Sequence, residues 1–467
     1  MTAADPESLF RDGNRHLEAG DIRHAEACFR EALRLAPGFA AAWSNLGYLL
    51  DQRGEAGEAE ACYRRALALD PLLAQTHLNL GALLASQNRF PAAEVAYSQA
   101  LLADPRATAA WSNLGVLYAC MKREDEAEQC YRQALELDPN HAKARFNLSY
   151  LLLRQGRFGE GWACFEARDG HAPLAARMTC PRWQGEPLAG KSLLILYEGG
   201  HGDMIQFSRY IPTLKARGAA SITLLCHPAL KTLLATLEGL DDAVAFDAEP
   251  PAKEWDYWVP LLSLPYLGKT RLEAIPAAIP YLRPDAERVA RWSPLLPREG
   301  MRVGLIWKGS PRHENDADRS LPALDLLAPL GQVPGVSFVS LQKGAGESEA
   351  AQPPEGLRLA DLGSRMADFA DAAAIVAGLD LVISVDTAMA HLAGALGKPC
   401  WLLLPDYKTD WRWLTGRSDS PWYPGALRLF RQTNRGDWPT VAAAARAALE
   451  DLARQWALRH PQGRLVQ

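Results

Sequence analysis

The sequence predicts a multidomain protein in which an all-α solenoid is followed by two α/β halves. Two observations support this fold class. Small, aromatic and proline residues recur every 34 residues through the first third of the chain, and short apolar runs then alternate with helical stretches. In addition, a chain of 467 residues with 48% hydrophobic residues is too long for one ordinary core, which favours two or three domains.

Four copies of the repeat are clear from their aligned small, aromatic and proline positions. The glycines are Gly13, Gly47, Gly81 and Gly115, and the prolines are Pro37, Pro71, Pro105 and Pro139. This is the tetratricopeptide pattern, in which pairs of antiparallel helices bury their apolar faces by stacking on their neighbours. A fifth, degenerate copy has Ser149 and Gly161 at the small positions, and we expect it to cap the array. The predicted solenoid therefore covers residues 1–172.

An asparagine recurs on the first helix of each pair, directly before a leucine. The four are Asn45, Asn79, Asn113 and Asn147. In such solenoids the first helix lines the concave face, and a side-chain amide can both donate and accept hydrogen bonds. A column of amides can therefore hold the backbone of an extended peptide. The alternative is that asparagine is merely a tolerated polar residue of the repeat, which Arg11 in the same slot of the first copy favours.

The composition argues against several classes of partner. A net charge of −5, with Lys and Arg scattered, provides no basic surface for nucleic acid. The N-terminus lacks the pattern of a secretory signal, and no apolar run is long enough to span a membrane. There is no CxxC pair, and four of the eight cysteines precede the aromatic position of a repeat, so we interpret them as packing residues rather than metal ligands. We expect a cytoplasmic protein.

A stretch rich in proline, glycine and tryptophan ends the repeat region, and residues 173–190 are predicted to be a linker. Apolar runs that suit strands follow in two sets. Residues 191–285 contain "SLLILY", "SITLLC", "AVAF" and "YWVPLLS", and residues 286–467 contain "RVGLIW", "VSFVSLQ", "LDLVISVD" and "CWLLLP". The expected helices lie near residues 203–217, 227–238, 366–378 and 387–397. Strands alternating with helices predict two Rossmann-like parallel sheets, whose ligands bind at the carboxyl ends of the strands.

The loop after the first predicted strand, "YEGGHGD", is rich in glycine. Gly199, Gly200 and Gly202 leave the backbone bare around His201, and Asp203 enters the first turn of the following helix. The carboxylate either stabilises the positive end of the helix or faces the space between the halves as a general base. The spacing matches neither a dinucleotide fingerprint nor a P-loop.

Three loops of the last half carry residues suited to an anionic ligand. In "ISVDTAMAH", a strand ends at Asp386 and a helix opens with Thr387 and Ala388, so N–H groups, a hydroxyl and the helix dipole converge on a site for a diphosphate. His391 lies one helical turn after Thr387, on the same face of this helix. An earlier loop contains Lys308, Arg319 and Ser320, and a later one contains Arg412 among tryptophans. The alternative for the earlier loop is that it is simply solvated. The alternative for the later loop is that it forms a lid over the core.

The stretches "GHGDMIQF", "GLIWKGSPRHENDADRSLP", "ISVDTAMAHLAGALGKPCWLLLP" and "DWRWL" resemble the family-nine glycosyltransferases, the heptosyltransferase-like group, in a bacterial subgroup that carries tetratricopeptide repeats. The resemblance implies a GT-B fold that binds an acceptor in the first half and a nucleotide-sugar in the second, usually without a metal or other cofactor. It implies that Asp203 is the base. It also implies that Asp386, Thr387 and His391 lie beside the donor diphosphate and sugar, and that Lys308 or Arg319 contacts phosphate.

The leading hypothesis is sugar transfer, with inversion, from a nucleotide-sugar to a protein hydroxyl presented by the solenoid. The predicted architecture of this chain resembles that of O-linked N-acetylglucosamine transferase, which joins tetratricopeptide repeats to a GT-B pair. One alternative is transfer to a glycan or a lipid-linked sugar, with the repeats as a docking arm. The other is an inactive transferase that serves as a scaffold for protein interactions.

Overall fold

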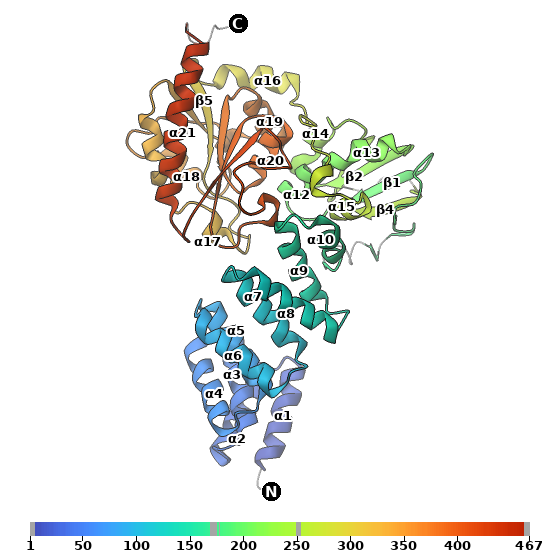
Figure 1. The fold of residues 1–467 in the computed structure, drawn as a ribbon, viewed down its shortest axis with the longest axis vertical. Coiled ribbons are helices and arrows are strands. Elements are labelled where there is room, and N and C mark those ends of the chain that lie inside the picture. Colours follow the sequence, from blue (N-terminus) through green and yellow to red (C-terminus); the bar gives the residue numbers. More distant parts are fainter. Residues whose placement is uncertain (1–4, 169–174, 177, 249–253, 462–467) are drawn as a thin grey trace. The chain divides into compact units, whose positions relative to one another are not determined.

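The structure is a computed structural model of the chain and describes residues 5–168, 175–176, 178–248 and 254–461 (Figure 1). The chain divides into two compact units, Met1–Leu151 and Leu152–Gln467. The first is all helical and the second contains parallel sheets with helices, as the sequence predicts. The predicted boundary between repeats and linker, at 172/173, lies outside the described residues. No helix within the described part of the chain is long and apolar enough to span a membrane.

The first unit consists of helix pairs that repeat along the chain (Figure 1, blue to teal). The pairs are α1 (Pro6–Glu18) with α2 (Ile22–Leu35), α3 (Ala40–Gln52) with α4 (Ala56–Leu69), α5 (Ala74–Ser86) with α6 (Phe90–Ala103), and α7 (Thr108–Cys120) with α8 (Glu124–Leu137). Each of the four prolines of the pattern follows the second helix of a pair within two residues. α9 (Ala142–Arg154) continues past the end of the unit.

Each repeat glycine lies against the aromatic ring of its own helix pair. A Cβ added at the glycine would come 2.5 to 2.8 Å from an atom of that ring. The pairs are Gly13 with Phe29, Gly47 with Tyr63, Gly81 with Tyr97, and Gly115 with Tyr131. Because these rings are buried, the glycines set how closely the two helices approach each other.

A second contact recurs where each pair ends, and the sequence pattern alone did not reveal it. Trp43, His77 and Trp111 occupy the same register, and a ring nitrogen of each lies 2.9 to 3.0 Å from the carbonyl oxygen of the proline six residues earlier. The guanidinium of Arg145 makes the equivalent contact with Pro139. Indole, imidazole and guanidinium all offer an N–H donor, so three residue types can satisfy the same backbone oxygen.

The second unit contains two sheets whose strand pairs are all parallel. In the described residues, β1 (Ser192–Leu196), β2 (Ser221–Cys226), β3 (Asp242–Ala245) and β4 (Tyr257–Pro260) form one sheet in the order β3-β2-β1-β4. The other sheet has the order β10-β9-β8-β5-β6-β7. Its strands are β5 (Met301–Ile306), β6 (Val336–Ser340), β7 (Leu359–Asp361), β8 (Leu381–Val385), β9 (Cys400–Leu404) and β10 (Leu427–Arg431). Both orders are those of Rossmann-like halves.

Helices lie before, between and after these strands along the chain. In the first half they are α12 (His201–Phe207), α13 (Ile211–Ala216), α14 (Lys231–Leu234) and α15 (Leu264–Leu267). In the second half they are α16 (Ala286–Trp292), α17 (Asp316–Arg319), α18 (Glu347–Ala351), α19 (Phe369–Ala377), α20 (Ala388–Ala395) and α21 (Trp438–Arg459). The helix expected over 203–217 is thus two helices joined by a 3-10 turn, and the one expected over 227–238 is a 3-10 turn followed by α14.

The end of the repeat region is built into the α/β unit. α10 (Phe158–Phe165), the second helix of the fifth copy, belongs to the second unit, although the sequence assigned it to the solenoid. The segment expected to be a linker is also packed there. Trp183 is buried, its backbone N–H donates to the carbonyl of Trp258 (2.8 Å), and the N–H of Trp258 donates to Pro181 (3.1 Å). Residues 181–183 therefore extend the edge of the first sheet at β4.

The glycine–aromatic contact predicts a large effect from one methyl group. In Gly81→Ala the new Cβ would lie 2.6 Å from two atoms of the Tyr97 ring. We expect this overpacking to lower the stability of the solenoid by roughly 1 to 3 kcal/mol, measured as a lower melting temperature by circular dichroism. Gly57→Ala in α4 is the matched control, because nothing lies within 4 Å of its Cβ. Equal melting temperatures for Gly81→Ala and wild type would show that the contact does not limit helix approach.

Candidate functional site at the carboxyl ends of the two sheets

The loops predicted to carry the site all leave the carboxyl ends of strands. In each sheet the winding reverses beside the first strand, between β1 and β4 in one and between β5 and β8 in the other. Ligands of doubly wound sheets bind at such switch points. Asp203 follows β1, residues 307–320 follow β5, Asp386 follows β8, and Arg412 follows β9.

The glycine loop brings α12 against α20. Gly199 has a positive φ of 73°, and the N–H of Gly200 donates to Oδ2 of Asp203 over 2.7 Å. A Cβ added at Gly202 would lie 2.9 Å from Cδ2 of His391 and 3.5 Å from the Cα of Ala388. The first turns of the two helices therefore touch, which only a residue without a side chain permits. Asp203, the next residue along α12, therefore lies close to the Thr387–His391 turn of α20.

A buried guanidinium joins this turn of α12 to the second half. Arg412 forms an ion pair with Asp203, and its Nε donates to the side chain of Gln206, also on α12. Its Nη1 lies 3.0 Å from Oδ2 of Asp410, and its Cζ is 4.4 Å from the centre of the Trp411 ring. Arg412 was predicted to bind the donor. The structure places its nitrogens on carboxylates and an amide of the protein.

Asp386, at the end of β8, is half-buried and has an unusual pKa. Burial raises its pKa to about 6, and the negative charge of Asp410 acts in the same direction. The charges of Arg319 and Arg412 oppose this rise. Its carboxyl group can therefore change protonation state near neutral pH, which few carboxyl groups do.

The remaining predicted residues on α20 are already held in place. Thr387 caps the helix, with its hydroxyl 3.3 Å from the N–H of Met389 and 3.1 Å from the hydroxyl of Ser384. His391 is buried, its Nδ1 lies 2.9 Å from the Tyr423 hydroxyl, and its ring stacks on Trp413. Burial, together with the positive charges of Arg412 and Arg209, lowers the pKa of His391 well below its usual value. The imidazole is therefore neutral.

The residues predicted to bind phosphate in the loop after β5 make contacts within the protein. Lys308 forms an ion pair with Glu349, whose other carboxylate oxygen accepts from the indole of Trp307 and the backbone N–H of Leu324. Ser320 accepts from the N–H of Gly309 and donates to Asp316, both over 2.8 Å. Arg319 also pairs with Asp316, over 3.4 Å, and its charge acts in addition on the carboxyl group of Asp386. Of the two candidate phosphate ligands, Arg319 is the one electrostatically coupled to the site.

His201 packs between the two halves. Its ring stacks on Phe369, at the start of α19, with the ring centres 5.1 Å apart, and lies 4.6 Å from the ring of His227. Burial and the neighbouring His227 lower the pKa of His201.

Sequence reasoning missed Gln206, Arg209 and Asp410, which hold the site together. Arg209 is buried, donates to the carbonyl of Trp422 (2.5 Å) and contacts the Tyr281 hydroxyl (3.1 Å). A signal for two of these residues was present in the sequence. Asp203, Gln206 and Arg209 follow each other at intervals of three, the spacing that places side chains on one face of a helix.

The predicted peptide-binding asparagines lie in the first unit and are all half-buried. The amide of Asn45 donates to Asn14 over 2.6 Å, and the oxygen of Asn79 accepts from Gln75 over 2.8 Å. These two amides are therefore partly engaged within the chain. Binding of a peptide by Asn45, Asn79, Asn113 and Asn147 stays a prediction.

The raised pKa of Asp386 predicts a pH-dependent stability. Its folded-state pKa of about 6 exceeds the ordinary 3.8, so the folded state holds this proton more tightly than the unfolded state. The free energy of unfolding should therefore fall as the pH rises from about 4 to about 6. Asp386→Asn should remove this component and stabilise the second unit at pH 7 by roughly 1 to 3 kcal/mol, measured by denaturant unfolding. An unchanged pH profile in that variant would contradict the assignment.

Comparisons with known proteins match both parts of the chain. Tetratricopeptide repeat models match residues 108–141, residues 10–74 and 78–124, and residues 130–163. The model of glycosyltransferase family 9 (heptosyltransferase) matches residues 332–402. That match contains Asp386, Thr387 and His391, whereas Asp203, Arg319 and Arg412 lie outside it.

One curated relative is the protein FlbA of Caulobacter vibrioides, 34% identical over 333 residues, covering 65% of this chain and 54% of FlbA. The chain thus spans about half the length of that relative. Among solved structures, MamA is 21% identical over 33% of this chain and 91% of its own, with a TM-score of 0.31. PilF of Pseudomonas aeruginosa is 24% identical over 35% of this chain and 77% of its own, with a TM-score of 0.34. From the family models, the chain carries tetratricopeptide repeats in its N-terminal part and a glycosyltransferase family 9 (heptosyltransferase) domain in its C-terminal part.

Proposed function

We propose that this chain is a glycosyltransferase of the GT-B type, which transfers a sugar from a nucleotide-sugar to an acceptor hydroxyl where α12 meets α20. The observation that carries the proposal is the contact between these helices. It brings a carboxylate, Asp203, next to the first turn of a helix that lies in the family 9 match. A base and an anion-binding helix end are the two parts that such a transfer needs.

The donor diphosphate is assigned to the N-terminal end of α20. The N–H groups of the first turn and the helix dipole favour an anion there, and Arg319 supplies a positive charge near Asp386. Ala388, Thr387 and the neutral His391 complete the donor side. As the leaving group departs, negative charge grows on the diphosphate, and these groups stabilise it without a metal or other cofactor in the proposed scheme.

The acceptor side is assigned to Asp203. In a single displacement, the acceptor oxygen attacks the anomeric carbon, the bond from that carbon to the diphosphate oxygen breaks, and the acceptor proton passes to Asp203. The configuration at the anomeric carbon is inverted. The hydrogen bond from Gly200 and the ion pair with Arg412 hold the carboxylate in place. Arg412 is therefore assigned as a positioning residue rather than as a donor ligand.

The acceptor is assigned to a protein, because the chain places a tetratricopeptide solenoid with a column of amides ahead of the transferase part. A glycan or lipid-linked acceptor is the second candidate, since the matching family model is that of the heptosyltransferases. A thermal-shift screen with UDP-, GDP-, ADP-, dTDP- and CMP-sugars identifies the donor first, because a ligand bound by the folded state raises the melting temperature. No shift with any of these donors would favour an inactive scaffold.

We predict that removing the proposed base lowers the rate of sugar transfer without preventing the nucleotide-sugar from binding. Asp203→Asn keeps the size of the side chain and can still accept from Gly200, but it cannot take up the acceptor proton. We expect the transfer rate to fall by a factor of about 10² to 10⁴, with the thermal shift caused by the nucleotide-sugar retained. Asp242→Asn, at the exposed start of β3, is the matched control and should transfer at the wild-type rate. A wild-type rate for Asp203→Asn would remove the residue from the mechanism.

Substitutions in the asparagine column distinguish a protein acceptor from a glycan acceptor while the solenoid stays folded. The double variant Asn79→Ala/Asn113→Ala removes two amides of the column, and we expect kcat/KM to fall on a protein acceptor but to stay unchanged for hydrolysis of the donor by water. Gln99→Ala/Gln133→Ala is the matched control, because these two amides have the same spacing on the second helices of their pairs. Equal efficiency of all three proteins on the natural acceptor would favour the glycan alternative.

A further inference from the structure

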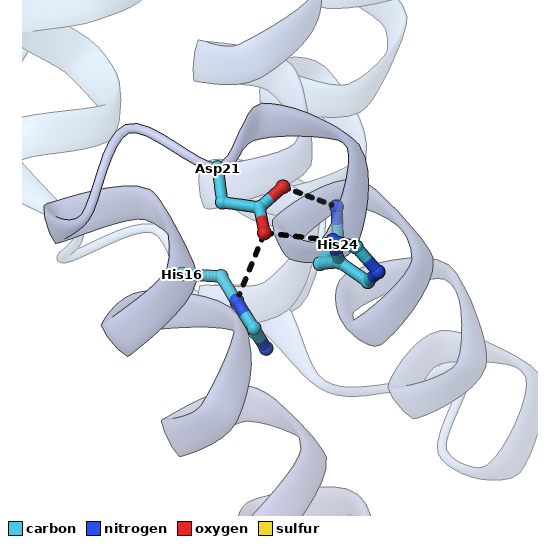
Figure 2. A group of neighbouring side chains, drawn as sticks. All are labelled: His16, Asp21 and His24. Carbon is cyan, nitrogen blue, oxygen red and sulfur yellow. Dashed lines mark hydrogen bonds and ion pairs between the residues drawn. The ribbon is translucent and has the colours of Figure 1, made fainter.

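Two imidazoles and one carboxylate converge at the first helix pair of the solenoid, apart from every residue used above. His16 lies in the last turn of α1, Asp21 caps α2, and His24 lies in the first turn of α2 (Figure 2). Oδ2 of Asp21 is 2.7 Å from Nδ1 of His24 and 3.5 Å from Nδ1 of His16. Across the part of the chain that the structure describes, no other three His, Cys, Asp or Glu residues bring their ligand atoms this close together.

The distances in this cluster suit a single metal ion. Zinc binds histidine nitrogen and carboxylate oxygen at about 2.0 to 2.2 Å, so two ligand atoms of a tetrahedral ion lie roughly 3.3 Å apart. The two Asp21–histidine distances, 2.7 and 3.5 Å, lie on either side of that value. The imidazole rings are nearly parallel, at 27°, with their centres 5.3 Å apart. Figure 2 shows both rings reaching the same carboxylate, so small side-chain rotations can place an ion among the three.

The known role of Asp21 does not use the oxygen that faces the imidazoles. As the N-cap of α2, Asp21 accepts from the backbone N–H of His24 through Oδ1, at 3.3 Å. Oδ2 is the atom that contacts both imidazole nitrogens. Capping and ion binding can therefore be separated by one substitution, because asparagine caps a helix as well as aspartate does but carries no negative charge.

We propose that His16, Asp21 and His24 form a binding site for a divalent transition-metal ion of the zinc type. His16 comes from α1, while Asp21 and His24 come from α2, so the ion cross-links the two helices of the first pair. The side chains are 41%, 41% and 71% exposed, respectively, so water completes the coordination. Imidazole and carboxylate together favour zinc and its neighbours over magnesium or calcium, which prefer oxygen alone. The site does not depend on the proposed transferase function.

The test is calorimetric titration of Zn²⁺ into the untagged full-length protein after treatment with a chelator. Wild type should bind one ion at this site, and Asp21→Asn, His16→Gln and His24→Gln should each weaken that binding by more than about tenfold, since even outer-shell changes cost that much. His77→Gln and His141→Gln are matched controls on the same solenoid, whose imidazoles contact Pro71 and Ala144 instead. Both should bind zinc as wild type does.

A second measurement guards against a variant that fails to fold. Zn²⁺ should raise the melting temperature of the wild-type solenoid and should leave that of His16→Gln/His24→Gln unchanged, while the two metal-free proteins have the same circular dichroism spectrum. The proposal is overturned if wild type binds no zinc, or if the double variant binds it with wild-type affinity.

Discussion

The contact between the two α/β halves depends on the guanidinium of Arg412. It is buried and bonds two side chains of α12, Asp203 and Gln206, together with Asp410 of its own loop. Without it, two carboxylates would be left without their cation at the junction, and unpaired charge in such a place is strongly destabilising. Arg209 crosses in the opposite direction, from the first half to the carbonyl of Trp422. The halves are thus tied together by one arginine from each side.

These arginines also govern the electrostatics of the candidate site. Three carboxylates, Asp203, Asp386 and Asp410, share the region with Arg319 and Arg412. Burial raises the pKa of Asp386 to about 6, and the negative charge of Asp410 adds to this rise. An anion that enters such a site is repelled less when Asp386 is protonated. In the proposed reaction, the site can therefore offset part of the charge of a diphosphate by taking up a proton on Asp386, while Arg412 holds the side chain of Asp203 in place.

The sequence predicted those parts of the fold and the site that depend on short-range patterns of residues. The repeats were visible because each copy carries the same small, aromatic and proline positions, and Asp203, Asp386, Thr387 and His391 were visible because they follow apolar strands. β7 was missed since it has only three residues, "LAD", and β10 since arginines interrupt its apolar run. The α21 helix was also missed.

The partners of the site residues were not predictable, because they lie far away in the sequence. Arg412 and Asp203 are 209 residues apart, and no local feature of either marks the other. Lys308 illustrates the same limit. Its position after a strand of the second half favoured phosphate binding, whereas a glutamate 41 residues later forms an ion pair with it. A sequence pattern can name a charged residue, but only the fold decides which opposite charge it meets.

The fifth repeat shows that the period of a sequence and the boundary of a folded unit need not coincide. Its aromatic position is kept as Phe165, but serine replaces the glycine that receives the ring in the other copies. Phe165 packs instead near Trp162 and Trp411, and Trp162 in turn contacts Phe207 at the end of α12. In this copy the aromatic ring therefore packs on apolar side chains of the α/β unit. α10, which keeps the repeat pattern in its sequence, thus forms part of the packing that holds α12, the helix that carries Asp203.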